Sequence, residues 1–286
     1  MAAQILAGQP VADSVLATVT EQVERLSASG RRVGLGTILV GDDPASAGYI
    51  RIKRSRAQEL GIDSHHLHLP QGATQQEVEQ AVRRFNQDER VDAMLIQHPL
   101  PQGLDYEALL EVMDPDKDAD GLHPYNLGKL VLGRPGPLPC TPAGIEAMLA
   151  HYKIDIAGAH VVILGRGLTL GRPLSILLSQ KRPGANAAVS VIHSAVQGWE
   201  RYTRQADVVV AAVGVPGILK ADHIRPGAVV VGGGVRYEGR RVLSDVEEGV
   251  AEVAGWVTPR VGGVGPMTVA MLFKNALDAA LRKEDV

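Results

Sequence analysis

Tyr49 and Lys53 are the first pair of residues whose types and spacing suit chemistry. They follow a loop of Gly, Asp and Pro and lie four residues apart, so a helix would place both side chains on one face. An aromatic ring can stack on a planar substrate, and an amine beside it can give or accept a proton. The alternative is a solvated basic helix face, because Arg51, Arg54 and Arg56 surround Lys53. Spacing alone favours this second interpretation.

Polar side chains also stand at the end of an apolar run and in a turn beyond it. Gln97 ends the run 93–97, which predicts a short buried strand. Open α/β sheets place their sites at the carboxyl ends of such strands. The turn at 117–121 carries two carboxylates, Asp118 and Asp120, and either of them can serve only to cap the turn.

A glycine-rich segment further along the chain is typical of a dinucleotide site. A predicted strand at 160–164 runs into Gly165, Gly167 and Gly171, and an apolar helix begins directly afterwards. Strand, glycine loop and helix N-terminus together aim backbone N–H groups and the helix dipole at a pyrophosphate. The spacing GxGxxxG is one residue longer than the usual fingerprint, so glycines with only a packing role are the alternative.

The next two predicted strands indicate which dinucleotide binds. The strand at 188–193 is followed by Ser194 and ends without the carboxylate that usually binds the ribose 2′-hydroxyl of NAD. An uncharged hydroxyl there, with Arg166 on the glycine loop, suits a 2′-phosphate, so we predict NADP. A solvated loop arginine is the alternative for Arg166. The strand at 207–213 ends at Gly214, which lets the backbone approach the cofactor.

A third glycine-rich segment leads into the end of the chain. Residues 259–267 hold three glycines and two prolines, among them Gly265 and Pro266, which predicts a shaped loop. An apolar helix is predicted from Thr268 to about Leu281. The loop either contributes to a site or simply connects two domains.

The predicted elements that carry these residues alternate between strand and helix along the chain. This alternation predicts a parallel α/β sheet. We predict helices at 11–27, 44–60, 75–86 and, capped by Thr141, up to Tyr152, with further strands at 34–40, 64–69 and 228–231. The Gly- and Pro-rich stretch 128–142 is the expected boundary. The predicted domains are 1–139, to which a helix in 268–286 returns, and 140–267.

Bulk composition narrows the class of protein. The 286 residues suffice for two domains of about 100–150 residues. A formal net charge of −3 gives no electrostatic reason to expect nucleic acid or an anionic membrane as partner. A single cysteine, Cys140, rules out an internal disulfide and a thiolate metal cluster, and it fits a reducing cytoplasm. No signal-like start and no membrane-length apolar stretch occur, so we expect a cytoplasmic enzyme without metal.

Taken together, the segments resemble the bifunctional methylenetetrahydrofolate dehydrogenase/methenyltetrahydrofolate cyclohydrolase family. The matching segments are collinear and span nearly the whole chain. They are VGDDPASAGYIRIK (40–53), LIQHPLP (95–101), DKDADGLHPYNLGKL (116–130), PCTPAGI (139–145), GRGLTLGRP (165–173), AVGVPG (212–217) and GGVGPMTVAML (262–272).

The resemblance implies an activity and an architecture. The family oxidises 5,10-methylenetetrahydrofolate with NADP and hydrolyses the methenyl product to 10-formyltetrahydrofolate, in one-carbon metabolism and purine biosynthesis. It implies an N-terminal α/β folate domain, a Rossmann-like doubly wound NADP domain, a C-terminal helix that returns to the first domain, and a homodimer.

The resemblance also assigns roles to residues. It implies that Tyr49 stacks on the folate, that Lys53 is the catalytic lysine supported by Gln97, and that Asp120 binds the pterin. Gly265 and Pro266 would lie against the substrate. The residues that it and the glycine pattern place on the cofactor side are Thr141, Gly165, Arg166, Gly167, Gly171, Ser194 and Gly214.

Four positions depart from the family pattern. His98 stands where Leu is common, Gly167 replaces a serine, 232–234 reads Gly-Gly-Gly in place of Asp-Val-Gly, and Arg260 interrupts a PVPGG loop. These departures bear on cofactor affinity and loop rigidity rather than on the residues around Lys53.

Three rival functions remain open at this point. A dehydrogenase for another small substrate, such as a shikimate-type oxidoreductase, has the same two-domain layout. A monofunctional member of the family would keep the fold and lose one activity. A non-catalytic NADP-binding module would keep only the glycine-rich turn.

Overall fold

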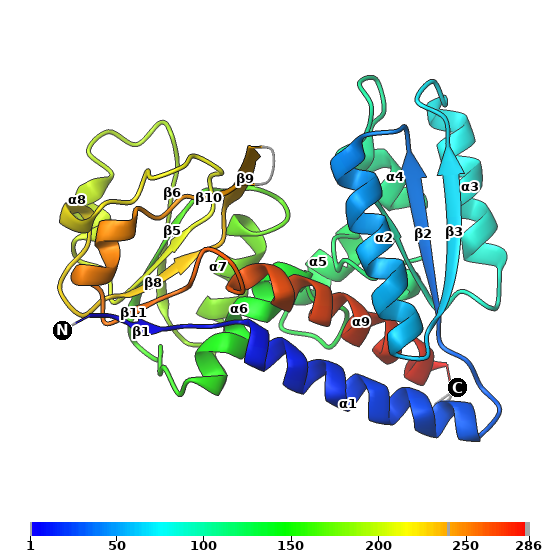
Figure 1. The fold of residues 1–286 in the computed structure, drawn as a ribbon, viewed down its shortest axis with the longest axis horizontal. Helices are drawn as coiled ribbons and strands as arrows, with labels where there is room; N and C mark the ends of the chain where they lie inside the picture. The colour runs from blue at the N-terminus through cyan, green and yellow to red at the C-terminus, as the bar shows by residue number, and fades with distance from the viewer. Residues whose placement is uncertain (1, 239–240, 284–286) are drawn as a thin grey trace. The chain divides into compact units, whose positions relative to one another are not determined.

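The computed structural model describes residues 2–238 and 241–283, and the chain divides into two compact units (Figure 1). The six-stranded unit holds Met1–Asp13, Leu130–Arg134 and Pro139–Met271. The three-stranded unit holds Ser14–Lys129, Pro135–Leu138 and Leu272–Val286. Each unit is built around its own parallel sheet.

The three-stranded unit consists of consecutive β-α-β connections. Strand β2 (Gly34–Val40) lies between β3 (Asp63–Leu69) and β4 (Ala93–Ile96) and pairs with both in parallel. Every residue of β2 is buried, as its nearly continuous apolar sequence predicts for a central strand. Helices α2 (Pro44–Glu59) and α3 (Gln75–Gln87) connect the three strands.

Local capping explains why α2 and α3 begin at the residues predicted from the sequence. The Asp43 carboxylate accepts the backbone N–H of Ser46 at 2.7 Å, directly before a proline at the first position of α2. At α3, Thr74 and Glu77 form a reciprocal capping box. Both caps satisfy N–H groups that a helix N-terminus leaves unpaired.

Several short elements of this unit are absent from the sequence prediction. They are α4 (Tyr106–Val112), the 3-10 helix η1 (Pro115–Lys117) and α5 (Pro124–Val131). Elements of three to eight residues give too few apolar repeats for a period to stand out. The preceding long helix α1 (Gln9–Ala28) is confirmed, two residues longer at its start than predicted.

The six-stranded unit has the strand order β1-β11-β8-β7-β5-β6, with every neighbouring pair parallel. Because β5 lies between β6 and β7, the direction of winding reverses at β5, which confirms the doubly wound, Rossmann-like prediction. The strands are β1 (Gln4–Ile5), β5 (His160–Leu164), β6 (Ala188–Ile192), β7 (Val208–Ala211), β8 (Val229–Gly232) and β11 (Trp256–Val257).

The central strands of this sheet bury an aliphatic core, which includes Val162, Val209 and Val230. Among the described residues of the unit, β9 (Val235–Glu238) pairs with β10 (Arg241–Ser244) in antiparallel orientation. The remaining elements are α6 (Cys140–His151), α7 (Gly171–Ser179), α8 (Glu200–Thr203), η2 (Ala221–His223) and η3 (Glu248–Glu252).

The start of the chain differs from the predicted domain division. Residues 1–139 are predicted to form one domain, whereas β1 pairs with β11 at the edge of the six-stranded sheet. A strand of two residues carries no periodic pattern, so its partner could not be read from the sequence.

The last helix, α9 (Val264–Arg282), begins four residues before the predicted start at Thr268. Pro266 therefore lies in the first helical turn, where its missing N–H removes no hydrogen bond. Beyond Met271 the helix belongs to the three-stranded unit. There the Asn275 side chain donates to the backbone oxygens of Ala119 and Leu138, both at 2.9 Å. The predicted return of this helix is confirmed.

The predicted cap at Thr141 is wrong. Helix α6 begins at Cys140, and its N-cap residue Pro139 makes no side-chain capping bond. The Thr141 hydroxyl lies 3.0 Å from the Thr268 hydroxyl in α9 instead. Because the φ of proline is fixed near the helical value, a helix can begin next to Pro139 without a side-chain cap.

Candidate active site

Lys53 and Gln97 form a direct contact within the three-stranded unit. Helix α2 carries Lys53, and Gln97 follows the last residue of β4. The Lys53 ammonium donates to Oε1 of Gln97 at 3.0 Å. The amide nitrogen of Gln97 donates to the backbone oxygen of His98 at 2.7 Å, which fixes the orientation of the amide. Gln97 is 7% exposed, so this oxygen is held in place for the amine.

Asp120 lies within the electrostatic reach of this amine. Burial raises the pKa of Asp120 to about 6, the positive charge of Lys53 opposes that rise, and the neighbouring Asp118 adds to it. A pKa near neutrality marks a carboxyl group in a partly desolvated site. The structure therefore brings together an amine, an amide and a carboxyl group from three separate segments.

The two carboxylates of the turn have different environments. Asp118 is 2% exposed, and its oxygens accept the backbone N–H groups of Gly121 at 2.9 Å and His123 at 2.8 Å. The Asn126 amide donates to it as well, at 3.0 Å. Asp118 is thus the carboxylate that builds the turn, and Asp120 is the one whose pKa responds to the charge of Lys53. This separates two alternatives that the sequence left open.

Tyr49 shares a face of α2 with Lys53, as their spacing predicts. Its ring is 40% exposed, which is unusual for a large aromatic side chain. An exposed ring one turn from an amine has a geometry that suits stacking on a planar ligand.

Tyr106 is a neighbour of the site that sequence reasoning missed. It is the first residue of α4, and its ring packs edge-on against His98 with centroids 5.2 Å apart. Burial raises the pKa of Tyr106 well above its ordinary value, and the charges of Asp120 and Asp118 raise it further. The phenol therefore stays protonated beside two carboxyl groups. No motif marks this tyrosine, and the departure at His98 was the only nearby signal.

The glycine loop of the six-stranded unit lies at the switch point of its sheet. Gly165 follows β5 with φ +116°, and a Cβ on it would collide with the backbone oxygen of Ala212 after β7. A Cβ on Gly171 at the start of α7 would collide with the backbone oxygen of Gly165. These two glycines have the packing role that the sequence left as an alternative.

Four other residues around this loop are exposed or leave space beside their backbone. Gly167 and Gly214 have no atom within 4 Å of the place a Cβ would take, and the Arg166 and Ser194 side chains are exposed. The nine residues of α7 direct an N-terminus at this region. The uncrowded backbone and the helix N-terminus suit the pyrophosphate of a dinucleotide. Neither Arg166 nor Ser194 is a carboxylate, so their side chains suit a 2′-phosphate.

Asp245 is a second residue that sequence reasoning missed. It is 1% exposed, and its Oδ2 accepts the backbone N–H groups of Val213 at 2.8 Å and Gly214 at 3.0 Å. Burial raises the pKa of Asp245, and hydrogen bonds from the loop N–H groups oppose the rise. Asp245 thus fixes the loop after β7. A Cβ at Gly234 would collide with its carboxylate, so any side chain at this position would have to displace Asp245.

We expect Asp245→Ala to lower the free energy of unfolding by about 2 kcal/mol, because it leaves two partly buried N–H groups unpaired. The KM for NADP should rise, since Gly214 loses its fixed position. Denaturant titration and steady-state kinetics measure the two effects.

Two further variants serve as controls. Asp245→Asn keeps an acceptor oxygen, so its free energy of unfolding should fall by less than that of Asp245→Ala. The matched control Asp222→Ala removes a carboxylate that is 75% exposed and should change stability by less than about 0.5 kcal/mol. Equal losses in Asp245→Ala and the control would contradict the role of Asp245.

The other departures from the family pattern are accommodated locally. The backbone N–H of Gly232 donates to the Thr258 hydroxyl at 2.7 Å, which orders the strand end without the usual carboxylate. Arg260 forms an exposed ion pair with Glu248 at 3.4 Å. In the first turn of α9, Gly265 is exposed and has nothing within 4 Å of a Cβ position.

Within 2–238 and 241–283, no group of three His, Cys, Asp or Glu side chains is placed to hold a metal ion. Over the same described ranges, no helix combines the length and the apolarity that crossing a membrane requires.

Two family models match the chain. The model described as "Tetrahydrofolate dehydrogenase/cyclohydrolase, NAD(P)-binding domain" matches residues 139–284, and "Tetrahydrofolate dehydrogenase/cyclohydrolase, catalytic domain" matches residues 6–120. "Bifunctional protein FolD 1" of Salinispora tropica is 57% identical over 280 residues, which cover 98% of this chain and 92% of that protein. The chain belongs to the tetrahydrofolate dehydrogenase/cyclohydrolase family.

Solved structures of the tetrahydrofolate dehydrogenase/cyclohydrolase family agree with this fold. The bifunctional FolD enzyme from Campylobacter jejuni matches with a TM-score of 0.95 at 37% identity, over 99% of this chain and all of that one. The Trypanosoma brucei FolD, solved in complex with NADP and an inhibitor, matches with a TM-score of 0.93 at 36% identity over the whole of both chains. The family resemblance drawn from the sequence is confirmed.

Proposed function

We propose that this chain oxidises 5,10-methylenetetrahydrofolate with NADP and hydrolyses the methenyl product to 10-formyltetrahydrofolate. The observation that carries the proposal is the contact of Lys53 with Gln97 at 3.0 Å beside Asp120. A packing or binding module has no need of a partly buried amine held by an oriented amide. Family membership and the FolD relatives support both activities.

The three-stranded unit binds the folate in this proposal. Tyr49 stacks on the planar part of the substrate, and the Asp120 carboxylate accepts hydrogen bonds from the donor edge of the pterin. Gly265 and Pro266 lie against the substrate through their backbone. These contacts position the methylene carbon, and positioning is the main requirement of hydride transfer. Bound NADP supplies the hydride acceptor.

Hydrolysis of the methenyl cation requires a base and an acid in turn. A neutral Lys53 amine accepts a proton from the water whose oxygen bonds to the methenyl carbon. The resulting ammonium returns a proton to N5 as the bond between N5 and that carbon breaks. The new hydroxyl group loses its proton to solvent, which leaves the formyl group on N10. The cation and one water thus give the neutral formyl product and one proton. Gln97 keeps the amine at the reacting carbon throughout.

The six-stranded unit binds NADP in this proposal, with the nucleotide contacts in residues 140–267. Backbone N–H groups of the loop from Gly165 to Gly171 and the N-terminus of α7 hold the pyrophosphate. Arg166 and Ser194 receive the 2′-phosphate. Gly167 and Gly214 allow close approach, and Thr141 lies on the cofactor side.

We further propose a homodimer located in the cytoplasm, whose product serves purine biosynthesis. The family resemblance supports the dimer and the metabolic role, and the single cysteine supports a reducing compartment.

A spectrophotometric assay tests the function directly. Methylenetetrahydrofolate and NADP should give NADPH together with methenyl absorbance, and that absorbance should then decay as water is consumed. NADPH formation without decay would show a dehydrogenase only. Decay of added methenyltetrahydrofolate without NADPH formation from the methylene substrate would show a cyclohydrolase only.

We expect NADP to be preferred over NAD by kcat/KM. The carboxylate of Ser194→Asp would repel the 2′-phosphate, so the variant should lose at least tenfold in kcat/KM for NADP and little for NAD. Steady-state kinetics with both cofactors measure the preference. Ser194→Asn is the control, because asparagine has the size of aspartate but no charge, and this variant should retain the preference for NADP. A wild-type enzyme that uses both cofactors equally would overturn the assignment of Ser194 and Arg166.

A further inference from the structure

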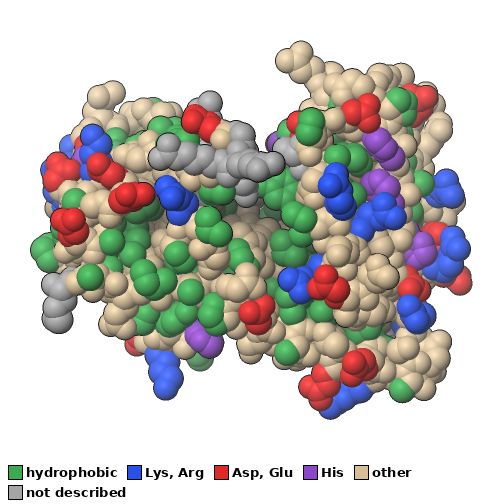
Figure 2. Space-filling view, viewed as in Figure 1, with side chains coloured by type: hydrophobic (Ala, Val, Ile, Leu, Met, Phe, Trp, Pro, Cys, Tyr) green, Lys and Arg blue, Asp and Glu red, His purple; other side chains and the backbone are tan. Residues whose placement is uncertain are grey.

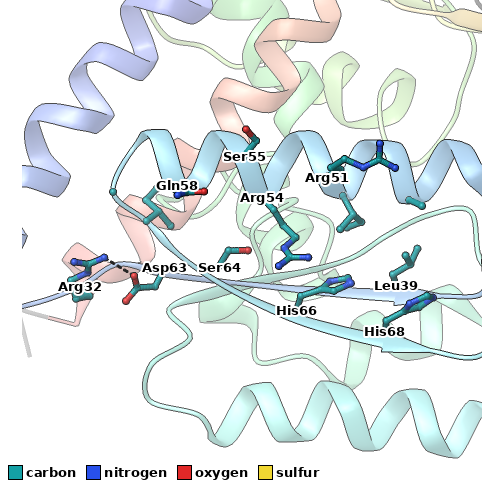
Figure 3. Close-up of a pocket in the computed structure, with 14 residues that line it drawn as sticks. Arg32, Leu39, Arg51, Arg54, Ser55, Gln58, Asp63, Ser64, His66 and His68 are labelled. Atoms are coloured by element: carbon teal, nitrogen blue, oxygen red, sulfur yellow. Dashed lines mark hydrogen bonds and ion pairs between the residues drawn. The ribbon is translucent and has the colours of Figure 1, made fainter.

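A pocket of about 640 Å³ lies between α2 and the edge strand β3, within the three-stranded unit (Figure 3). Its floor is apolar, because Leu39, Ile50 and Ile62 line it and each is 3% exposed. The volume falls in the range of small-molecule sites, roughly 300–1,000 Å³. Neither Tyr49 nor Lys53 lines it. The pocket therefore occupies a different face of α2 from the proposed active site.

The rim of this pocket is positively charged. Arg51 and Arg54 lie one turn apart on α2, both are exposed, and neither forms an ion pair with any described residue. The acidic lining residue is Asp63, and Arg32 already pairs with it at 2.6 Å. Figure 2 shows Lys, Arg and His side chains gathered on the face that α2 and β3 form. Two arginine charges at the rim are thus left without compensation.

Two histidines complete the opposite wall. His66 and His68 lie two residues apart in β3, so their side chains point to the same side of the strand. Figure 3 shows Arg54 reaching from α2 toward His66. Burial lowers the pKa of His66, and the neighbouring Arg54 and His68 lower it further. The field of the guanidinium therefore acts inside the pocket. An anion would relieve this repulsion.

We propose that this pocket binds a small organic phosphate, with the phosphate group between Arg51, Arg54 and the His66 imidazole and the apolar part of the ligand on the floor. His68 only shapes the wall, because its Nε2 already lies 3.0 Å from the backbone oxygen of Gly41 and 3.3 Å from the Asp42 carboxylate. Donors approach from the helix on one side and from the strand on the other. A tetrahedral group with three oxygens and close to two negative charges satisfies both walls, whereas a planar carboxylate offers two oxygens and one charge. The proposal is independent of the folate chemistry.

Titration calorimetry on the full chain, with NADP saturating so that the nucleotide site is filled, tests the proposal with three probes. Phenyl phosphate supplies both the phosphate and an apolar body, inorganic phosphate lacks the body, and benzoate replaces the phosphate by a carboxylate. Phenyl phosphate should bind at least tenfold more tightly than either of the others. The ring signals of His66 should shift in NMR spectra, and those of the exposed His151 should not.

Matched variants locate the binding. Arg54→Gln should weaken phenyl phosphate binding by about tenfold or more, because it removes a charge-assisted hydrogen bond. Arg56→Gln removes an arginine from the same helix that pairs with Glu59 and does not line the pocket, and it should bind as the wild type does. No binding at millimolar phenyl phosphate, equal binding of benzoate, or equal affinity in Arg54→Gln would each overturn the proposal.

Discussion

Lys53→Met is expected to lower the cyclohydrolase kcat by about a thousandfold, while binding of folate and NADP survives. General acid–base catalysis contributes about 10²–10⁴ in rate, and methionine fills the space of the lysine stem without a transferable proton. The decay of methenyl absorbance measures the rate, and equilibrium titration measures binding of each ligand. Hydride transfer in the proposed mechanism requires positioning only, so the dehydrogenase should lose much less.

The control for this variant is Arg51→Met, which removes one positive charge two residues away in the same exposed helix. It should leave both activities within about twofold, because surface substitutions have small effects. Loss of hydrolysis in the control would show that the charge of α2 matters rather than the amine of Lys53. Full hydrolysis by Lys53→Met would refute the role of the lysine.

Asp120→Asn is expected to weaken folate binding by about 10- to 100-fold, since a hydrogen bond to a charged group contributes about 1.5–3 kcal/mol. The amide keeps the size of the carboxylate and loses its charge. The Kd for the folate measures the effect. Asp105→Asn changes a helix-capping carboxylate of the same unit and should leave the Kd unchanged. Unchanged binding in Asp120→Asn would contradict the pterin assignment.

The same carboxyl group predicts a pH dependence. Burial raises the pKa of Asp120 to about 6, so the carboxylate form decreases as pH falls through that value. The dehydrogenase kcat/KM should therefore fall below about pH 6 in the wild type and lose this dependence in Asp120→Asn. Lys53→Met removes the charge that lowers the Asp120 pKa, so in that variant the fall should begin at higher pH. A wild-type profile that stays flat through pH 6 would argue against the carboxylate.

Much of the framework was predictable because its signals are local. Strands β2 and β5 begin and end at the predicted residues, since each is an apolar run bounded by polar or turn-forming residues. The contact of Lys53 with Gln97 was not readable from spacing, which favoured a solvated basic face. It came from the family resemblance, and the 3.0 Å hydrogen bond now supplies its geometry.

What escaped prediction depends on contacts between distant segments. The β1–β11 pair joins residues some 250 positions apart, and neither strand has a pattern of its own. Tyr106 enters the site only because α4 packs its ring against His98. Asp245 reaches a loop more than thirty positions earlier in the chain. Side chains of this kind are found by packing, which a single sequence does not encode in its periodicity.

The fit of Asp245 against Gly234 restricts how this protein can evolve. The carboxylate occupies the space that any side chain at 234 would need, and it also sets the backbone at Val213 and Gly214. A single substitution at 234 displaces the carboxylate, and a single substitution at 245 releases the loop. Each substitution is therefore expected to be harmful by itself, which couples the two positions even though neither residue takes part in the proposed chemistry.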